Sequence, residues 1–337
     1  MQARFFDEKS GRCSLCARRC RISGNSRGFC GVRGNGETLT YGRLTAAGAD
    51  PIEKKPLYHF LPGSRTFSVS SFGCNFTCLH CQNYELSQVR AGAADDVSVP
   101  ASPEEVVSAA VSAGCLSVSF TYNEPTVSYE FMYDVAKLAH ASGLQTAMIT
   151  NGYMTEEALR DIAPYMDAVR VDLKAFSDGF YRKVCGGARL HPVLDTVVCA
   201  RELRRHVELV TLLIPGMNDS REEIARMFSW ELEALGPAVP HHFTGFRPMF
   251  HMMDVPATTV DELDYVFRAA KSAGLWYPYV GNVRHAAGSR TVCPACGNVV
   301  IERDGYSARM SVMSGGRCSV CGLDIEGVFG AERTHRF

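Results

Sequence analysis

Residues 66–83, TFSVSSFGCNFTCLHCQN, carry the pattern that points most directly to the fold and the chemistry of this chain. Residues 66–71 alternate β-branched or aromatic side chains with small ones and run into Phe72-Gly73, which predicts a strand that ends in a loop. The cysteines that follow, spaced C-x3-C-x2-C, are Cys74, Cys78 and Cys81. Three thiolates can bind three irons of a [4Fe–4S] cube and leave the fourth iron open to a ligand that is not protein. The alternative interpretation is a zinc site or a chance spacing.

Strand-like and helix-like segments alternate after these residues, which predicts a parallel sheet with right-handed crossovers. The strands are expected at residues 66–71, 116–122, 144–150, 168–173, 207–214, 241–246 and 275–281. Helices are expected between them at residues 103–114, 127–143, 155–165, 192–206, 220–236 and 260–274. Ser102 and Glu105 have the spacing of a capping box at the first helix. The pattern favours an α/β fold with a partial (β/α)6 barrel, whose catalytic groups lie at the carboxyl ends of the strands.

Polar residues at several expected strand ends are candidates for the same site as the three cysteines. They are Tyr122, Asn123, Glu124, Asn151, Asp172, Lys174, His242 and Arg247. Asp172 and Lys174 share one face of a strand because strand side chains alternate. A lysine is a natural counter-charge for a carboxylate, and an aspartate can orient a hydroxyl or amino group. The alternatives are an ordinary strand-end turn at residues 122–125 and a surface ion pair for Asp172 and Lys174.

Two further cysteine groups flank the expected barrel, which divides the chain into residues 1–65, 66–285 and 286–337. The C-terminal group consists of two C-x2-C pairs, Cys293, Cys296, Cys318 and Cys321. This spacing is typical of a zinc ribbon or rubredoxin-like module, in which four thiolates close a tetrahedral zinc or iron site. The alternative is four thiols without a ligand, although so short a module scarcely folds without metal.

The N-terminal group has the spacing C-x2-C-x3-C-x9-C and also offers four ligands, Cys13, Cys16, Cys20 and Cys30. It predicts a site for zinc or for a second [4Fe–4S] cluster, and the spacing does not decide between them. A cluster at this position would relay electrons inward, whereas zinc would only fold the segment. Residues 1–33 carry eight Lys/Arg against two Asp/Glu. This basic face is either simply solvated or a docking surface for an acidic partner.

Composition excludes several other classes of protein. The chain has 337 residues, with 46% hydrophobic residues, 21% charged residues and a net charge of −1, so no overall field attracts nucleic acid or a membrane. No apolar run approaches a membrane-spanning length, and the N-terminus lacks the apolar core of a signal peptide. Fourteen cysteines in such a chain predict metal or redox use in a cytoplasmic protein rather than disulfides. Cys115, Cys185 and Cys199 are expected to be buried free thiols.

The motif CNFTCLHC resembles the signature of the radical S-adenosylmethionine (radical SAM) superfamily. The resemblance implies that the open iron binds the amino and carboxylate groups of SAM, and that one electron breaks a C–S bond. A 5′-deoxyadenosyl radical then takes hydrogen from a substrate. Glu124-Pro125 match a Gly-Gly-Glu-Pro stretch that holds the SAM amino group, with Tyr122-Asn123 in place of the two glycines. His80 occupies the position of an aromatic residue that packs near the adenine.

Other motifs narrow the resemblance. Thr150-Asn151-Gly152, Asp172-Leu173-Lys174 and residues 212–223, LLIPGMNDSREE, are similar to segments of pyruvate formate-lyase activating enzymes. Ile149 replaces an aspartate of their cation site, and Arg247 stands nearest to a histidine that they place near SAM. The motifs CSLC, YGRLTAAGADPIEKKPLYHFLPG and FTYNEPT and the C-terminal cysteine pairs resemble AmmeMemoRadiSam system radical SAM enzymes almost end to end. That resemblance implies Memo-like or AMMECR-like partner proteins and an electron donor such as flavodoxin or ferredoxin.

The first hypothesis is therefore an oxidoreductase of the radical SAM type. Its substrate is either a backbone glycine of a glycyl radical enzyme, as for the activating relatives, or a small molecule or another protein. The rival hypothesis is a non-catalytic metal-binding scaffold, or a zinc-ribbon protein that binds nucleic acid. The nearly neutral net charge gives no footprint for nucleic-acid binding, and a non-catalytic barrel does not need an open cluster corner.

Overall fold

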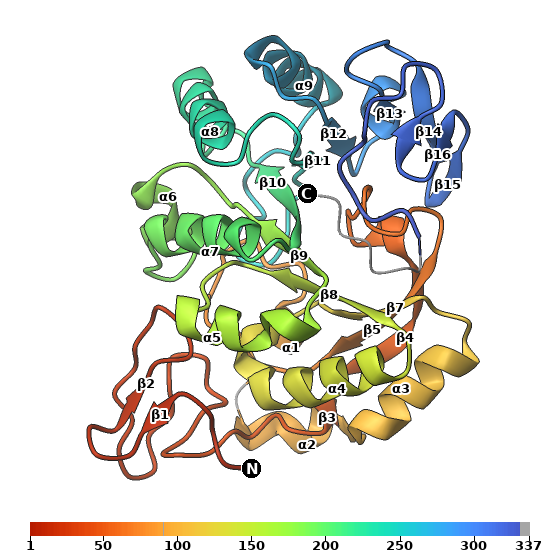
Figure 1. The fold of residues 1–337 in the computed structure, drawn as a ribbon. Coiled ribbons are helices and arrows are strands. Elements are labelled where there is room, and N and C mark those ends of the chain that lie inside the picture. The colour runs from red at the N-terminus through yellow and green to blue at the C-terminus, as the bar shows by residue number, and fades with distance from the viewer. Residues whose placement is uncertain (90, 331–337) are drawn as a thin grey trace.

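The structure is a computed structural model of the chain and describes residues 1–89 and 91–330. An eight-stranded sheet lies at its centre, in the order β12-β11-β10-β9-β8-β7-β5-β4 (Figure 1). Strand β4 pairs antiparallel with β5 at one edge, and the other strands run parallel to their neighbours. The strands are β4 (Ala46–Pro51), β5 (Arg65–Ser70), β7 (Ser117–Phe120), β8 (Gln145–Thr150), β9 (Ala168–Asp172), β10 (His206–Leu213), β11 (His241–Gly245) and β12 (Pro278–Gly281).

Helices follow the parallel strands and form an outer layer on the sheet (Figure 1). They are α3 (Pro103–Ser112), α4 (Tyr129–Ala141), α5 (Glu156–Ile162), α6 (Asp178–Val184), α7 (His191–Glu202), α8 (Arg221–Ala234) and α9 (Val260–Ala273). The alternation confirms the predicted α/β fold with a mostly parallel sheet. The predicted capping box is present at α3, where Ser102 Oγ accepts from the Glu105 N–H and the Glu105 carboxylate accepts from the Ser102 N–H. A cap of this kind stabilises a helix by about 1 kcal/mol.

The sheet is buried on both faces, as expected for parallel strands. Every residue of β8 and β11 is buried. On the outer face, apolar side chains pack against the helices in the main core. On the inner face, Ile52, Leu57 and Phe60 pack against Ala147 and Ile149 of β8, so the segment before β5 fills the inside of the sheet.

Two elements of this fold differ from the sequence-based prediction. Strand β4 was not predicted because its sequence, AAGADP, is made of residues with low strand propensity. It lies within residues 1–65 but belongs to the central sheet. Helix α6 is too short to show a clear helical period, and Ser177 caps it by accepting from the Phe180 N–H.

The N-terminal part of the chain has little regular structure. Strands β1 (Phe6–Asp7) and β2 (Arg12–Cys13) pair antiparallel, and β3 (Arg43–Leu44) pairs with β6 (Val99–Pro100). The segment is anchored to the loop after β8, because the Ala17 N–H donates to the Tyr153 carbonyl over 2.9 Å and Thr155 Oγ1 donates to the Ser14 carbonyl over 2.9 Å. The remaining helical turns are η1 (Ile52–Lys54), α1 (Tyr84–Ser87), η2 (Ala91–Ala93), α2 (Ala94–Val97), η3 (Pro125–Ser128), η4 (Ala163–Tyr165) and η5 (Ala287–Ser289).

The C-terminal part forms small antiparallel sheets beside β12 (Figure 1). They contain β13 (Thr291–Val292), β14 (Val299–Asp304), β15 (Ser307–Met310), β16 (Met313–Ser314) and β17 (Arg317–Cys318). The antiparallel hairpin β14–β15 lies between the two cysteine pairs. Val300 and Ile301 pack in one apolar cluster with Tyr277 and Tyr279, which joins this part to the end of the central sheet.

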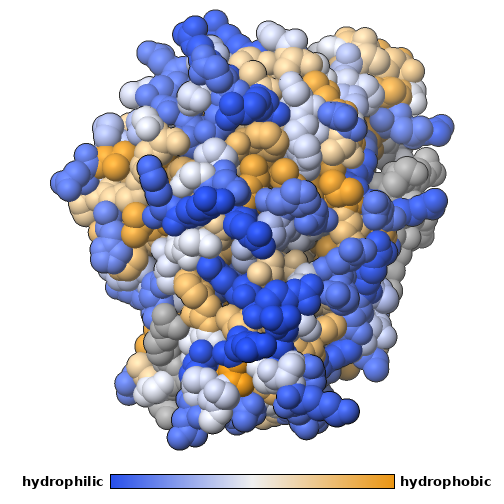
Figure 2. All heavy atoms as spheres, turned by 90° about the vertical axis from the view of Figure 1, so that its left-hand side faces the viewer, coloured by the Kyte–Doolittle hydropathy of each residue, from blue (hydrophilic) through white to orange (hydrophobic). Residues whose placement is uncertain are grey.

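The outer surface carries no large continuous apolar area on the side shown in Figure 2, where hydrophilic side chains separate small apolar patches. Within residues 1–89 and 91–330, no helix combines the length and the apolar character that crossing a membrane would take.

Candidate active site

A cavity of about 340 Å³ lies at the carboxyl ends of the parallel strands. Its volume is within the range of small-molecule sites, roughly 300–1,000 Å³. The loop after β5 supplies the three central cysteines, and the loops after β7, β8 and β9 supply polar side chains. The cavity thus brings together the predicted residues Cys74, Cys78, Cys81, Tyr122, Asn123, Glu124, Asn151, Asp172 and Lys174.

The cysteine loop is held at its start by the side chain of Asn123. Asn123 Nδ2 donates to the Gly73 carbonyl over 3.0 Å, and its Oδ1 accepts from the Ser71 N–H over 3.1 Å. Gly73 has φ +81°, a conformation that favours glycine. Asn123 therefore serves as a clamp on the cysteine loop, a role that the motif comparison alone did not suggest.

The three thiols of this loop are shielded from solvent to different degrees. Cys78 is buried, whereas Cys74 and Cys81 are partly buried. Burial raises the pKa of the Cys74 thiol well above its usual value and also raises that of Cys81. A hydrogen bond from the Cys185 thiol lowers the pKa of Cys78, so Cys185 is a contact of this loop that the sequence did not reveal. Thiols in such surroundings become thiolates when a metal supplies the positive charge.

Two buried nitrogen atoms of the loop lack hydrogen-bond partners among the described residues. Asn75 Oδ1 accepts from Asn151 Nδ2 over 2.7 Å, but Asn75 Nδ2 has no partner. His80 is buried, its Nδ1 has no partner, and burial together with the charge of Lys174 lowers its pKa to about 3. His80 is therefore a neutral ring in the wall of the cavity. The His80 nitrogen lines the cavity and is of the kind that a bound group satisfies, whereas Asn75 lines the smaller pocket beside the N-terminal cysteines.

Glu124 ties the ends of two neighbouring strands together. Its Oε1 accepts from Thr150 Oγ1 over 2.7 Å and from Thr126 Oγ1 over 2.5 Å, and its Oε2 accepts from the Asn151 N–H over 2.7 Å. Burial raises the pKa of Glu124, although these hydrogen bonds oppose the shift. The carboxylate thereby fixes the loop that carries Asn151.

Asp172 and Lys174 form a partly buried ion pair on β9 and the residues after it. Asp172 Oδ2 lies 2.6 Å from Lys174 Nζ, and Asp172 Oδ1 lies 2.7 Å from an Arg170 Nη. Burial opposes ionisation of Asp172, but the charges of Arg170 and Lys174 prevail and lower its pKa. Burial likewise opposes the charge of Lys174, and Asp172 reverses this so that the pKa of Lys174 is raised. Both side chains are therefore charged in the wall of the cavity.

Arg170 and the floor of the cavity were not predicted from the sequence. Arg170 is 7% exposed, lines the cavity, and its Nε–H has no hydrogen-bond partner among the described residues. Lys55 Nζ lies 2.7 Å from Asp50 Oδ2 and donates to the Tyr122 hydroxyl over 3.0 Å. The Tyr122 hydroxyl donates to the same Asp50 oxygen over 2.6 Å. These groups add a buried, charged inner end to the cavity.

His242 and Arg247 lie outside this cavity. His242 is on the same face of β11 as Thr244, which does line the cavity, but two residues deeper in the sheet. Its Nε2 lies 2.7 Å from the Glu208 carboxylate, which also accepts from backbone N–H groups of the segment 52–61. Arg247 is exposed after the end of β11. The structure therefore brings neither residue to the three cysteines.

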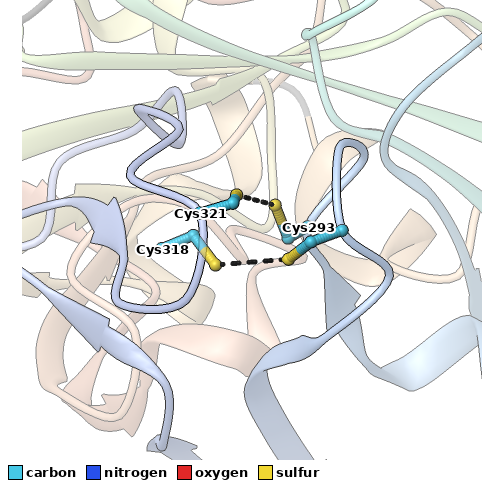
Figure 3. A group of neighbouring side chains, drawn as sticks. Cys293, Cys318 and Cys321 are labelled. Atoms are coloured by element: carbon cyan, nitrogen blue, oxygen red, sulfur yellow. Dashed lines mark hydrogen bonds between the residues drawn. The ribbon is translucent and has the colours of Figure 1, made fainter.

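The C-terminal cysteines form a compact group (Figure 3). Their four sulfur atoms lie within 4.8 Å of one another, with Cys293 and Cys321 3.5 Å apart and Cys296 and Cys318 3.6 Å apart. Asn298 Nδ2 donates to the Cys296 sulfur over 3.3 Å. A tetrahedral zinc site with Zn–S distances of about 2.3 Å places its sulfurs about 3.8 Å apart. The group could therefore hold one metal ion of that size.

The N-terminal cysteines surround a second, smaller pocket. Cys13, Cys16, Cys20 and Cys30 all line it. The basic charge of this segment is partly neutralised, because Arg4 lies 2.7 Å from Asp161 and the buried Arg33 lies 3.0 Å from Glu130. The positive charge that is left for docking an acidic partner is therefore smaller than the count of Lys and Arg residues indicates.

Comparison with known proteins places these features in a family. The family model described as the Radical SAM superfamily matches residues 68–228. An uncharacterized protein of Methanocaldococcus jannaschii is 39% identical over 335 residues, which cover 96% of this chain and 98% of that protein. The pyruvate formate-lyase-activating enzyme of Clostridium pasteurianum is 25% identical over 174 residues, 49% of this chain and 68% of that enzyme. A radical SAM methyltransferase from Sphaerobacter thermophilus shares the fold, with a TM-score of 0.51, 16% identity and 71% coverage of each chain.

The chain belongs to the radical SAM superfamily, and it is an enzyme. The family implies a [4Fe–4S] cluster and SAM as cofactors. The residues present fit both groups: three cysteines from one loop line a cavity that also holds orphaned nitrogen donors and the charged pair of Asp172 and Lys174.

Proposed function

We propose that this enzyme cleaves SAM reductively at the cavity and uses the product to abstract hydrogen from a substrate. The observation that carries the proposal is the convergence of Cys74, Cys78 and Cys81 with Asp172 and Lys174 on one cavity, at the carboxyl ends of the parallel strands. The three cysteines would hold three irons of the cluster and leave the fourth to SAM. When bound, the two cofactors supply one-electron cleavage of a C–S bond, which gives methionine and a radical that takes one hydrogen atom.

The side chains of this chain bind and orient in the proposed reaction. Lys174 offers a positive charge for the SAM carboxylate, and Asp172 offers a negative charge for the amino group. Glu124 lines the cavity, but its carboxylate accepts a hydrogen bond from the Asn151 backbone N–H, so we assign Glu124 a positioning role. Asn123 holds the cysteine loop, and the neutral His80 ring offers a flat surface in the wall.

The proposal is tested by turnover without any added substrate. The protein is reconstituted anaerobically with iron and sulfide, reduced with dithionite and given SAM, and 5′-deoxyadenosine is measured by mass spectrometry. The wild type should form 5′-deoxyadenosine, and Cys78→Ala should form none and lose the central cluster's absorbance. Cys199→Ala is the matched control, because Cys199 is also buried but lies in α7 outside the cavity. Turnover by Cys78→Ala would falsify the site assignment.

Two classes of substrate remain in the proposal. The similarity to a pyruvate formate-lyase-activating enzyme supports a glycyl radical enzyme as the substrate. The buried inner end, with Arg170 and Lys55, supports a small molecule that carries a negative charge. Transfer of deuterium to 5′-deoxyadenosine from a candidate protein that is deuterated at its glycine Cα positions would identify the first class. Transfer of deuterium from a perdeuterated small-molecule extract would identify the second class.

The motifs that resemble AmmeMemoRadiSam system enzymes support the same proposal at a finer level. We infer Memo-like or AMMECR-like proteins as partners, a flavodoxin or ferredoxin as electron donor, and zinc at the C-terminal group. Metal analysis of the purified protein tests the last point, with about one zinc per chain expected from a closed four-thiolate site.

A further inference from the structure

The four N-terminal cysteines line a small, partly enclosed pocket. The pocket has a volume of about 20 Å³, which exceeds the roughly 10–15 Å³ that one water needs. Its other walls are mostly apolar and include Leu15, Ile22, Phe29 and Val127. The thiols of Cys13, Cys16, Cys20 and Cys30 therefore border a shielded space and not a solvent-filled groove.

The volume of this space distinguishes the possible occupants. In a zinc tetrahedron each sulfur is about 2.3 Å from the centre, so no water-sized sphere fits between the four sulfurs. The C-terminal cysteines have that compact geometry, with all sulfurs within 4.8 Å of one another. Among the described residues, these are the cysteines that gather so closely. The N-terminal four instead border a space that is slightly larger than one water needs, and they are not gathered as closely as the C-terminal four.

An arginine with one unpartnered donor lines the same pocket. Arg33 is 3% exposed, and its two terminal nitrogens are each 3.0 Å from the Glu130 carboxylate. Its Nε–H has no hydrogen-bond partner among the described residues. The Phe29 N–H donates to the Cys20 sulfur over 3.3 Å. Buried donors of this kind suit an anionic metal–thiolate group, whose sulfurs accept hydrogen bonds.

The pocket shares a wall with the proposed active site. Asn75 follows Cys74 in the central loop and lines the N-terminal pocket, and Arg18 Nε donates to the Asn75 carbonyl over 2.8 Å. A Cβ placed on Gly73 would lie 2.9 Å from the Cys30 carbonyl oxygen, so the two backbones are in direct contact. One side of this contact is Cys30 itself, and the other is Gly73, which directly precedes Cys74.

From these observations we propose that Cys13, Cys16, Cys20 and Cys30 bind a second iron–sulfur cluster, which serves as the electron entry to the three-cysteine site. A low-potential one-electron donor protein is oxidised by one electron, which the N-terminal site accepts and then passes to the three-cysteine site. The N-terminal site returns to its oxidised state in each cycle, and no proton or bond change is needed there. The role as electron entry depends on the proposed function, but the presence of the cluster does not.

The test separates the two cysteine groups by metal content and by spectrum. A variant with Cys74→Ala, Cys78→Ala and Cys81→Ala is reconstituted anaerobically, and its iron, sulfide and zinc are counted. We expect about eight irons in the wild type and about four in this variant, which should still show the electron paramagnetic resonance signal of a reduced cluster. A Cys13→Ala/Cys16→Ala variant should lose the other half of the iron. A triple variant without iron, or with two zincs per chain, would overturn the proposal.

The relay is tested by the rate at which reduced flavodoxin reduces the central site. In the Cys13→Ala/Cys16→Ala variant we expect the electron paramagnetic resonance signal of the reduced central cluster to appear at least tenfold more slowly with flavodoxin. Dithionite should still reduce the central cluster in this variant. An unchanged rate would overturn the relay. If that variant does not fold, the iron content of the triple variant decides the matter alone. Failure of the proposed function would appear instead as an iron-loaded wild type that forms no 5′-deoxyadenosine.

Discussion

The N-terminal and C-terminal cysteine groups each contain four cysteines, yet their surroundings differ. The C-terminal sulfurs gather within 4.8 Å, and Cys321 is exposed. The N-terminal cysteines border a shielded pocket whose wall includes Asn75 of the central loop. A compact group at the surface suits a structural metal, whereas a wider group that touches the active-site loop suits a part of the catalytic apparatus. The location of a cysteine group relative to the cavity thus indicates its role better than the number of its ligands.

The largest effect should come from removing the C-terminal site. In a Cys293→Ser/Cys296→Ser variant we expect loss of the zinc that we propose for this site and local unfolding of residues 291–325, because a structural zinc contributes about 10–16 kcal/mol of apparent folding free energy in small modules. Limited proteolysis and zinc analysis measure this outcome. The iron content and the formation of 5′-deoxyadenosine should persist in the variant.

Cys115→Ser provides the control for the effect of a buried serine at a site without a metal group. If the C-terminal variant lost its iron together with its zinc, the two outer groups would not be independent. That result would contradict the contrast drawn between them.

The second prediction concerns the contact between the N-terminal segment and the central loop. Gly73→Ala should lower the iron content and destabilise the protein by roughly 2–5 kcal/mol, the sum of the left-handed conformation and the overpacking. Gly73 has φ +81°, and a Cβ there would lie 2.7 Å from Val32 Cγ1 and 2.9 Å from the Cys30 oxygen. Gly114→Ala is the matched control, since Gly114 has φ +64° but no atom within 4 Å of its Cβ position. Gly114→Ala should lower the free energy of unfolding by only roughly 1–2 kcal/mol, the cost of the left-handed conformation for alanine.

The difference between these two glycine variants isolates the close packing, because both change the same conformational term. Chemical denaturation of the reconstituted protein measures it. Equal destabilisation by both variants would show that the N-terminal segment moves aside for the added methyl group at little cost. The contact between that segment and the central loop would then not support an electron-transfer role.

The third prediction addresses the clamp on the cysteine loop. Asn123→Ala removes two buried hydrogen bonds, to the Ser71 N–H and the Gly73 carbonyl, and leaves both backbone groups unpaired. We expect about 1–3 kcal/mol of lost stability and a lower occupancy of the central site. Asn282→Ala is the control, because Asn282 also lines the cavity but its side chain, among the residues that the structure describes, donates only to the Gly245 carbonyl. Iron retention during gel filtration compares the two variants, and equal retention would exclude a clamp at Asn123.

Much of this site could be predicted because its residues follow one another along the chain. The cysteines form one short motif, and Asp172 and Lys174 lie at the end of a strand whose apolar run is plain. The carboxyl ends of parallel strands lie at the same edge of a sheet, so the predicted strand order alone places these residues near one another. The sequence also predicted the capping box at α3, because Ser102 and Glu105 satisfy each other locally.

The depth of a residue within the sheet could not be predicted. Thr244 and His242 share a face of β11, but only Thr244 reaches the cavity, because the Glu208 carboxylate holds His242 one layer deeper. Lys55 reaches the floor because the segment before β5 folds inside the sheet, and the sequence offers no signal for that path. Contacts between distant segments of this kind depend on tertiary packing and not on a local pattern.

The smallest expected effect is a pH dependence at the joint between the C-terminal part and the central sheet. His59 is completely buried, with its ring nitrogens 2.6 Å from the Glu326 carbonyl oxygen and 2.6 Å from the Tyr279 hydroxyl. Burial lowers the pKa of His59 from 6.5 to about 3, and Arg303 adds to the shift while Glu208 opposes it. The unfolded chain therefore binds a proton between these pH values that the folded chain does not. Stability is complete above pH 6.5 and falls as the pH drops toward 3.

His59→Gln removes this titration and should flatten the slope of unfolding free energy against pH below pH 6.5. The slope from one such group reaches about 1.4 kcal/mol per pH unit. Urea unfolding at pH 7, 6 and 5 measures it, with His191→Gln as the control because the His191 side chain is 85% exposed. A Gln variant that is less stable at pH 7 but keeps the wild-type slope would show that His59 joins the two parts only by packing. The acid sensitivity of the chain would then belong to the thiolates of the C-terminal group, whose protonation releases their metal.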